Sequence, residues 1–278
     1  MAAVDGSHAD VAQLETTLLL EAMYQRFGHD FRAYDQLAVQ RKLRVLMDAR
    51  ALATVSALQE QLLHGAGVVQ DVLRTLALAP VGLFEDPAFA RELRTVLAPG
   101  LHASAVPKIW LAECAGAPEA WALAIVLAEQ QLANRTEIYA TVANEELMLE
   151  MRDATVPAEM VAQWRDLYQQ GGGAGDLAAF FDIADGRARL RASLRERITW
   201  AQYSLATDAS FNEFQAILCS RALPDFGPAL RQRALGLFHD SLARFGVLAI
   251  DRQLMPGDAH AASYQAIGAQ RHWYKRIA

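Results

Sequence analysis

The sequence contains few cysteines, with only Cys114 and Cys219 in 278 residues. Two cysteines exclude a disulfide framework and a four-cysteine metal site, and we predict no metal centre. Long apolar runs are also lacking, and none approaches the ~18 residues that a membrane-spanning helix requires. The N-terminal segment has neither the basic region nor the apolar core of a signal peptide. We therefore expect a cytoplasmic protein without membrane insertion.

Motifs of common enzyme classes are absent as well. The seven histidines show neither an H-E-x-x-H motif nor the Cys/His spacing of a zinc site. No G-x-S-x-G elbow indicates a serine hydrolase. A solvated or capping role is favoured for His239 and Asp240 over a catalytic dyad, and Trp110 and Trp121 are interpreted as core. The net charge of −6 argues against nucleic-acid binding.

The first part of the chain has the apolar spacing of amphipathic helices, with apolar residues three or four positions apart. Hydrophobic residues make up 53% of the chain and charged residues 21%, which is typical of a globular protein. We predict a helical N-terminal domain over 1–80 and a linker with one helix over 81–104. The predicted helices of these two parts are 11–27, 30–47, 54–64, 68–78 and 88–97.

Strand-like and helical runs alternate in the rest of the chain, which indicates an α/β domain over 105–278 with a mostly parallel sheet covered on both faces. The predicted strands are 108–112, 137–141, 198–201, 214–219 and 247–250. The predicted helices are 118–132, 144–154, 157–169 and 228–244. A closing hairpin is predicted over 264–267 and 272–276.

A small antiparallel insert is predicted over 170–196. Asp185 and Gly186 separate two β-prone runs, and a type I′ hairpin turn requires positive φ at both of its central residues. Alternating arginines on its second half form either a solvated face or a docking surface for an acidic peptide or an anionic ligand. These arginines are Arg187, Arg189, Arg191, Arg195 and Arg197.

The segment 108–127 reads as a first strand, a tight turn and a helix entered through Pro118. In an open α/β sheet, a nucleotide-like ligand normally binds at such a turn, because free backbone N–H groups and the helix dipole converge there. The turn holds one glycine, Gly116, beside Glu113 and Cys114. The scaffold of a ligand site is therefore present, with unusual side chains on it.

Seven segments in matching order carry a family resemblance. They are Y-Q-R-F-G-H-D-F-R-A-Y (24–34), L-F-E-D-P (83–87), W-L-A-E-C-A-G-A-P-E-A-W-A-L-A (110–124), I-Y-A-T-V-A-N-E-E-L (138–147), L-R-E-R-I-T-W-A-Q-Y-S-L (194–205), F-Q-A-I-L-C-S-R-A-L-P-D-F (214–226) and L-F-H-D-S-L-A-R-F-G-V-L-A-I (237–250). In these segments the chain resembles the CheR-type chemotaxis receptor methyltransferases. The resemblance implies a helical N-terminal domain, a Rossmann-like S-adenosylmethionine domain and an inserted β-subdomain that grips a receptor peptide. It also implies methyl transfer to glutamate side chains of chemoreceptors.

The resemblance breaks at positions that contact the cofactor in the family. Relatives read T-x-N-x-T-x-F-F-R-D-P where this chain reads A-L-A-P-V-G-L-F-E-D-P, so Glu85 stands at the arginine near the methyl-transfer centre. Their glycine turn, S-A-G-C-x-T-G-E-E-P-Y-S, is L-A-E-C-A-G-A-P-E-A-W-A here. Glu113 and Ala117 therefore occupy the two glycine positions.

Further departures follow the other strands. Val142 stands where the family has an acid that binds ribose hydroxyls, and Ser204 stands for an asparagine on the adenine side. The family element C-R-N-V-L-I-Y-F reads C-S-R-A-L-P-D-F here. This change places Arg221 and Asp225 at the asparagine and the tyrosine beside the methyl group.

Magnitudes suggest that these departures remove the cofactor site. Each lost charge-assisted hydrogen bond costs about 1.5–3 kcal/mol, and a micromolar affinity amounts to about 8 kcal/mol in total. We therefore predict no cofactor, and an inactive, degenerate CheR-like protein with a regulatory or interaction role in signalling. The degenerate cleft positions are Glu85, Glu113, Cys114, Gly116, Ala117, Val142, Ser204, Arg221 and Asp225.

Two alternatives remain open. The altered cleft or the arginine clusters could bind a different ligand, such as a cyclic dinucleotide (cyclic di-GMP), because arginines suit phosphate geometry. The chain could also retain glutamate O-methyltransferase activity on chemoreceptors. We expect signalling or receptor proteins as partners, with an anionic nucleotide as the alternative ligand. The candidate partner-binding or anion-binding residues are Arg32, Arg41, Lys42, Arg44, Arg187, Arg189 and Arg191.

Overall fold

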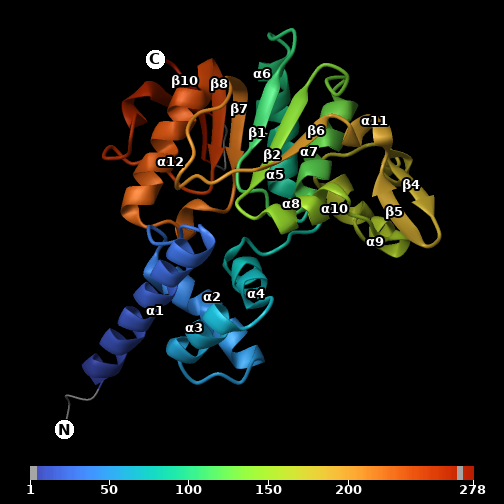
Figure 1. Cartoon of the computed structure of the whole chain (residues 1–278). Coiled ribbons are helices and arrows are strands. Elements are labelled where there is room, and N and C mark those ends of the chain that lie inside the picture. The colour runs from blue at the N-terminus through green and yellow to red at the C-terminus, as the bar shows by residue number, and fades with distance from the viewer. Residues whose placement is uncertain (1–4, 268–271) are drawn as a thin grey trace.

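The computed structural model describes residues 5–267 and 272–278. The start of the predicted helical domain, 1–4, and the turn of the predicted closing hairpin lie outside the described residues. Figure 1 shows a small helical unit, in blue, at one end of a larger α/β unit. Among the described residues, no helix combines the length and the apolar character needed to cross a membrane.

The described N-terminal part consists of α-helices 9 to 23 residues long. They are α1 (Asp5–Phe27), α2 (Gln36–Ala49), α3 (Val55–His64) and α4 (Val68–Leu76). The side chains of Asp35 and Thr54 accept hydrogen bonds from backbone N–H groups in the first turns of α2 and α3, so polar caps start both helices. Gly28 follows α1 with a φ of 78°. The four predicted helices are present, although α1 begins earlier than predicted and α2 begins at Gln36 and not at 30.

The linker helix is longer and less regular than predicted. It consists of α5 (Pro87–Glu92), a wide π-helical turn (Leu93–Leu97) and α6 (Ala98–Leu101). Asp86 caps α5 by accepting a hydrogen bond from the Phe89 N–H at 3.0 Å. Buried leucines of this segment pack into the core of the α/β unit, which fixes the linker against the sheet.

The described α/β unit is built on a seven-stranded sheet with the order β6-β2-β1-β7-β8-β10-β9. Its strands are β1 (Lys108–Leu111), β2 (Glu137–Val142), β6 (Ile198–Gln202), β7 (Phe214–Cys219), β8 (Leu242–Ile250), β9 (Tyr264–Ile267) and β10 (His272–Arg276). The first five pair in parallel, whereas β10 runs antiparallel to both β8 and β9. The predicted mostly parallel sheet and its closing antiparallel pair are therefore confirmed.

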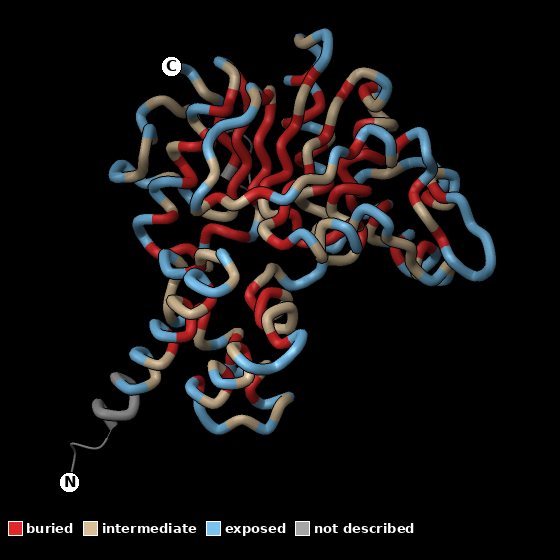
Figure 2. Tube along the Cα trace, viewed as in Figure 1, coloured by how far each residue is buried: buried red, intermediate tan, exposed pale blue. Residues whose placement is uncertain are grey.

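Helices cover both faces of the sheet. They include α7 (Ala117–Glu129), α8 (Glu145–Arg152) and α12 (Pro228–Ser241). Successive side chains of a strand point to opposite faces. Ile109 and Leu111 of β1 accordingly lie in the core that contains α7, while Trp110 lies in the core that contains α12. Figure 2 shows the resulting band of buried residues along the central strands.

The predicted boundary between α12 and β8 is wrong. β8 begins at Leu242, so α12 ends at Ser241 and not at 244. Leu242 pairs with Phe214 of β7, and the register then shifts before Ala216 pairs with Val247. The extra residues form an irregular strand start that includes Phe245 at a φ of 67°. Pairing with β7, which a local helical pattern does not reveal, decides this boundary.

The predicted hairpin forms a three-stranded antiparallel sheet with one additional strand. Its strands are β3 (Val156–Pro157), β4 (Phe181–Ala184) and β5 (Arg187–Leu190), in the order β3-β5-β4. Asp185 and Gly186 have φ values of 51° and 71°, as a type I′ turn requires. The sheet reaches back beyond 170, because β3 precedes the predicted insert. The predicted domain boundaries stay predictions.

Short helices flank the strands of this antiparallel sheet. They are α9 (Ala158–Gln163), α10 (Arg165–Gln170), a 3-10 turn at Leu177–Phe180 and α11 (Ala192–Arg195). Two further 3-10 turns, Leu223–Asp225 and Ala261–Ser263, lie in the loops after β7 and before β9. The predicted helix 157–169 is thus divided at Trp164. Phe181 packs edge-on against Trp121 of α7 with 5.9 Å between ring centroids, which anchors the small sheet to the large one.

Candidate functional site

The carboxyl ends of β1, β2 and β7 meet at one edge of the sheet, and the turn between β1 and α7 lies over it. The Ala112 N–H donates to the Leu218 carbonyl at 2.8 Å, and the Cys114 N–H donates to the Thr141 carbonyl at 2.9 Å. The turn is thereby held between its two neighbouring strands. This is the place at which open α/β sheets bind their ligands.

Glu119, in the first turn of α7, folds back over this turn. Its carboxylate accepts a hydrogen bond from the Ala115 N–H at 2.7 Å and another from the Ser220 hydroxyl at 2.8 Å. Burial raises the pKa of Glu119, and these two hydrogen bonds oppose that rise. Glu119 is not among the site residues predicted from the sequence. The signal was the second glutamate of the family turn motif, which this chain retains.

A cavity of about 290 Å³ lies beside Glu119, between the linker and the ends of β1 and β7. Its polar lining comes from Glu85 and Asp86 of the linker, Glu119 of α7, and Ser220 and Arg221 after β7. Arg221 lies 3.8 Å from the Glu85 carboxylate, and both side chains are about half exposed. Three carboxyl groups and one guanidinium thus face a common space.

A smaller cavity of about 30 Å³ lies where the helical unit meets the sheet edge. This volume holds about one water molecule. The residues that line it include Tyr34 of the helical unit, Glu113 and Cys114 of the turn, Val142 of β2 and Asp225 after β7. The segment 77–82 passes from the smaller cavity, which residues 77 and 78 line, to the larger one, which residues 81 and 82 line.

Glu113 adopts a left-handed backbone conformation with a φ of 51°. Burial raises the pKa of its carboxyl group to about 8, and the charge of Lys42 opposes this rise. No described residue donates a hydrogen bond to this carboxyl group. Glu113 is therefore a partly buried acid whose acceptor atoms are available at the ligand edge.

Lys42, one of the predicted partner-binding or anion-binding residues, points inward from α2, and its side chain is only 24% exposed. Its ammonium donates to the Asp225 carboxylate at 2.6 Å and to the backbone carbonyls of Leu76 and Ala77 at 2.9 and 3.0 Å. These bonds cap the end of α4 and join the helical unit to the β7–α12 loop. Helical spacing groups Lys42 with the exposed Arg41 and Arg44 but cannot show a partner so distant in the sequence.

The structure brings most of the predicted cleft positions to this edge. Gly116 lies in the turn before α7 at a φ of 155°, and Ala117 is the first residue of α7. Ser204 lines neither cavity, and its N–H donates to Asp208 at 3.0 Å within its own loop. Cys114 and Cys219 are both free and buried.

The predicted arginine clusters are largely paired with neighbouring groups. Arg32 binds Asp30 and Glu21, and it precedes α2 instead of belonging to it. In the small sheet, the guanidinium of Arg187 donates to Thr155, while Arg189 and Arg191 lie 3.4 and 3.9 Å from aspartates. Arg41 and Arg44 are exposed on α2. Figure 1 shows α2 and the small sheet well separated. Their role in binding partners stays a prediction.

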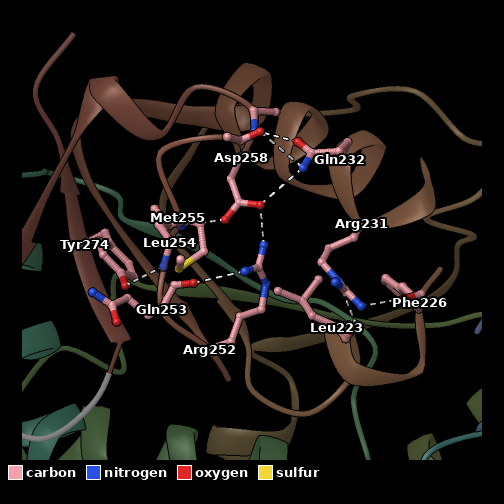
Figure 3. Close-up of polar contacts among 12 residues, drawn as sticks. Leu223, Phe226, Arg231, Gln232, Arg252, Gln253, Leu254, Met255, Asp258 and Tyr274 are labelled. Carbon is pink, nitrogen blue, oxygen red and sulfur yellow. Dashed lines mark hydrogen bonds and ion pairs between the residues drawn. The ribbon is translucent and has the colours of Figure 1, made fainter. Parts of the chain in front are cut away.

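The loop after β8 forms the adjoining rim of the sheet edge. Figure 3 shows Asp258 as its centre, where it accepts hydrogen bonds from Arg252, Gln232 and the Met255 N–H. The Asp251 carboxylate accepts from the Leu223 N–H at 3.2 Å, which ties this loop to the one after β7. Burial raises the pKa of Asp251 to about 6. The rim is thus held by polar contacts within the loop, to Gln232 of α12 and to the loop after β7.

Comparisons with known proteins identify both parts of the chain. The family described as CheR methyltransferase, SAM binding domain, matches residues 82–261, and the CheR methyltransferase all-alpha domain matches residues 15–77. A Pseudomonas putida protein described as "Putative methyltransferase Cher3" is 35% identical over 237 residues, which cover 85% of this chain and 87% of that protein.

More distant matches were also found. A 104.1 kDa uncharacterized protein of Rhodobacter capsulatus is 27% identical over 227 residues; the match covers 79% of this chain and 23% of that longer protein. The crystal structure of the glycopeptide N-methyltransferase MtfA with S-adenosylmethionine matches 69% of this chain and 66% of that one, at 15% identity and a TM-score of 0.37.

The prediction that S-adenosylmethionine does not bind is contradicted, because the family that matches residues 82–261 is the S-adenosylmethionine-binding domain itself. The prediction counted side chains that had been lost at single positions. It did not count groups that remain at the same edge, such as Glu119 and the backbone of the turn. The resemblance drawn from the seven segments is confirmed. The chain, with its helical unit and its α/β unit, belongs to the CheR methyltransferase family.

Proposed function

We propose that this protein is an S-adenosylmethionine-dependent methyltransferase that acts on carboxylate side chains of a signalling or receptor protein in the cytoplasm. The family membership and the large cavity beside Glu119 support this proposal. The observation that carries it is the charge of that cavity. Three carboxyl groups and one guanidinium surround a space of about 290 Å³ at the ends of β1 and β7.

This lining fits the charged end of S-adenosylmethionine. That end carries a sulfonium, an ammonium and a carboxylate, so two cations and one anion require partners of opposite charge. Glu85, Asp86 and Glu119 supply acidic partners, and Arg221 supplies a cationic one. When bound, the cofactor supplies a methyl group that an oxygen nucleophile attacks as the S–C bond breaks. A carboxylate is such a nucleophile in its ionised form.

The chain's own residues would bind the cofactor and orient it. Glu119 holds the turn through its bonds to Ala115 and Ser220, so the turn keeps one conformation under the cofactor. The smaller cavity holds about one water molecule. An adenosine group on that side therefore requires the linker or the helical unit to move outward.

Two measurements test the proposal. Calorimetry with S-adenosylmethionine and S-adenosylhomocysteine should show saturable binding at one site per chain. Labelled methyl groups from S-adenosylmethionine should then appear as base-labile carboxyl esters on purified chemoreceptor signalling fragments. Absence of binding would refute the assignment of the cofactor. Binding without transfer to any such fragment would refute the methyltransferase activity and leave a regulatory protein that binds the cofactor.

A further inference from the structure

Glu113 and Val142 lie at the same level of the sheet edge. Leu111 of β1 is opposite Ala140 of β2 in the parallel register, so each strand reaches this level two residues later. Both Glu113 and Val142 also line the smaller cavity. An acid therefore lies in the turn that follows β1, beside the position at which β2 carries the apolar side chain of Val142.

Nucleoside ligands of open α/β sheets are usually held by an acid after the second strand, which accepts hydrogen bonds from ribose hydroxyls. Val142 cannot accept a hydrogen bond. Neighbouring strands are about 4.8 Å apart, and a glutamate side chain, one methylene longer than aspartate, can span that step. A carboxylate at the end of β1 can thus reach the space that an acid on β2 would occupy.

We propose that Glu113 is the acid that binds the ribose hydroxyls of the cofactor, in place of a carboxylate on β2. This inference rests on the proposed function, because it assumes that S-adenosylmethionine binds at this edge. It assigns a role to a glutamate that stands where a glycine-rich turn would have no side chain.

The backbone at Glu113 supports a functional role. The residue has a φ of 51°, a conformation in which a side chain with a Cβ atom is strained. Strained residues of this kind cluster at functional sites, where the surrounding structure holds them. The bond from the Cys114 N–H to the Thr141 carbonyl supplies such a restraint here.

The carboxyl group of Glu113 also has acceptor capacity to spare. Lys42 is the cation whose charge acts on it, but a lysine ammonium has only three N–H donors. All three are engaged, by Asp225, the Leu76 carbonyl and the Ala77 carbonyl. Glu113 therefore lies near the charge of Lys42 without a direct hydrogen bond to it, and its carboxyl oxygens can accept hydrogen bonds from a ligand.

The test is a set of dissociation constants for S-adenosylhomocysteine, measured by calorimetry. We expect Glu113→Gln to weaken binding by about tenfold or more, a factor that corresponds to about 1.4 kcal/mol. Glu159→Gln is the matched control, because Glu159 is an exposed acid on α9, and it should bind like the wild-type protein. Thermal melting of each variant verifies that it is folded.

A second set of variants removes the acid at position 113 and places one on β2, at position 142. Glu113→Gly should weaken binding as well, and addition of Val142→Asp to that variant should restore much of the affinity. A third arm uses the wild-type protein alone and compares 5′-methylthioadenosine with its 2′,3′-dideoxy analogue. The hydroxylated ligand should bind at least about tenfold more tightly.

The outcomes separate this inference from the proposed function. If the wild-type protein does not bind S-adenosylhomocysteine, both fail. If the wild-type protein binds it and Glu113→Gln binds equally well, the function stands and the role of Glu113 is overturned. Equal affinity of the wild-type protein for the hydroxylated and dideoxy ligands overturns it too, even if the variants do not fold.

Discussion

The ammonium of Lys42 lies 2.6 Å from the carboxylate of Asp225, and this ion pair joins the helical unit to the α/β unit beside the ligand edge. Backbone bonds reinforce the junction. The Asp35 N–H donates to the Asp225 carbonyl at 2.9 Å, and the Gly227 N–H donates to the Ala33 carbonyl at 3.0 Å. The orientation of the two units is thus set at the same loop that borders the cofactor side.

Replacement of Lys42 should destabilise this junction. Lys42→Met leaves Asp225 and the carbonyls at the end of α4 without their shared donor. A buried hydrogen-bonding group that loses its partner costs about 1–3 kcal/mol, and the pair is mostly buried, with 24% and 19% of the side chains exposed. We expect the free energy of unfolding to fall by about that amount in urea titrations.

The exposed neighbour Arg44 provides the control. Arg44→Met lies on the same helix but faces solvent, and such surface changes usually stay within about 0.5 kcal/mol. Equal effects of Arg44→Met and Lys42→Met on unfolding would show that the ion pair with Asp225 does not hold the junction.

The ionisation of Glu113 should make stability depend on pH. Burial raises the pKa of Glu113 from an ordinary value of 4.5 to about 8 in the folded protein. Between these values the folded state binds more protons than the unfolded state, so the free energy of unfolding falls as pH rises through this window. Glu113→Gln cannot ionise and loses this contribution. We expect the melting temperature of the variant, relative to the wild-type protein, to increase from about pH 5 to about pH 9.

The comparison of Glu113→Gln with the wild-type protein isolates the titration of Glu113. Asp251, whose pKa burial raises to about 6, titrates in both proteins, and its contribution cancels in the difference. A difference in melting temperature that stays constant over the whole range would mean that Glu113 does not titrate as a buried acid.

The sequence predicted the regular elements better than their long-range contacts. The apolar run at Phe214–Cys219 predicted β7 with its observed bounds, because a buried parallel strand carries its signal locally. The start of β8 was missed, since it depends on pairing with β7. The sequence also did not reveal that the Lys42 side chain points inward, because its partner Asp225 is 183 residues away.

The sequence located the candidate site, but the prediction that the site does not bind the cofactor was wrong. The turn after β1 was located from its strand–turn–helix pattern, and Glu113 and Val142 do line one cavity there. The loss of cofactor binding was inferred from separate substitutions. A sequence does not show that Glu119 reaches both Ala115 and Ser220. Nor does it show that Glu113, in the turn after β1, lies beside Val142 of β2. Such compensation becomes visible only when the strands are placed side by side.

Packing around Tyr168 gives a prediction that is independent of function. Its hydroxyl donates to Glu129 at 2.5 Å, and its ring lies 5.3 Å from that of Phe84. A Cβ atom added at Gly173 would overlap this ring. Gly173→Ala should therefore lower the free energy of unfolding by about 1–3 kcal/mol, as overpacking does.

Gly236 is the matched glycine control. It lies inside α12, and a Cβ atom there would meet nothing within 4 Å. Gly236→Ala should raise stability by up to about 1 kcal/mol, because alanine favours a helix interior over glycine. Urea titration of both variants measures this contrast. Two changes of the same sign and size would mean that the ring of Tyr168 can move aside.

Removal of the Glu119 carboxylate should impair the turn and the cofactor together. Glu119→Ala leaves the Ala115 N–H and the Ser220 hydroxyl without their acceptor, and each unsatisfied buried donor costs about 1–3 kcal/mol. We expect lower stability and an affinity for S-adenosylmethionine at least about tenfold weaker. Ser220→Ala separates the two effects, because it retains the bond from Ala115 that shapes the turn. It should cost less affinity than Glu119→Ala in the same calorimetric titration. If the two variants weaken binding equally, the link to β7 matters more than the acid itself, and Glu119 acts by positioning the loop rather than by facing the cofactor.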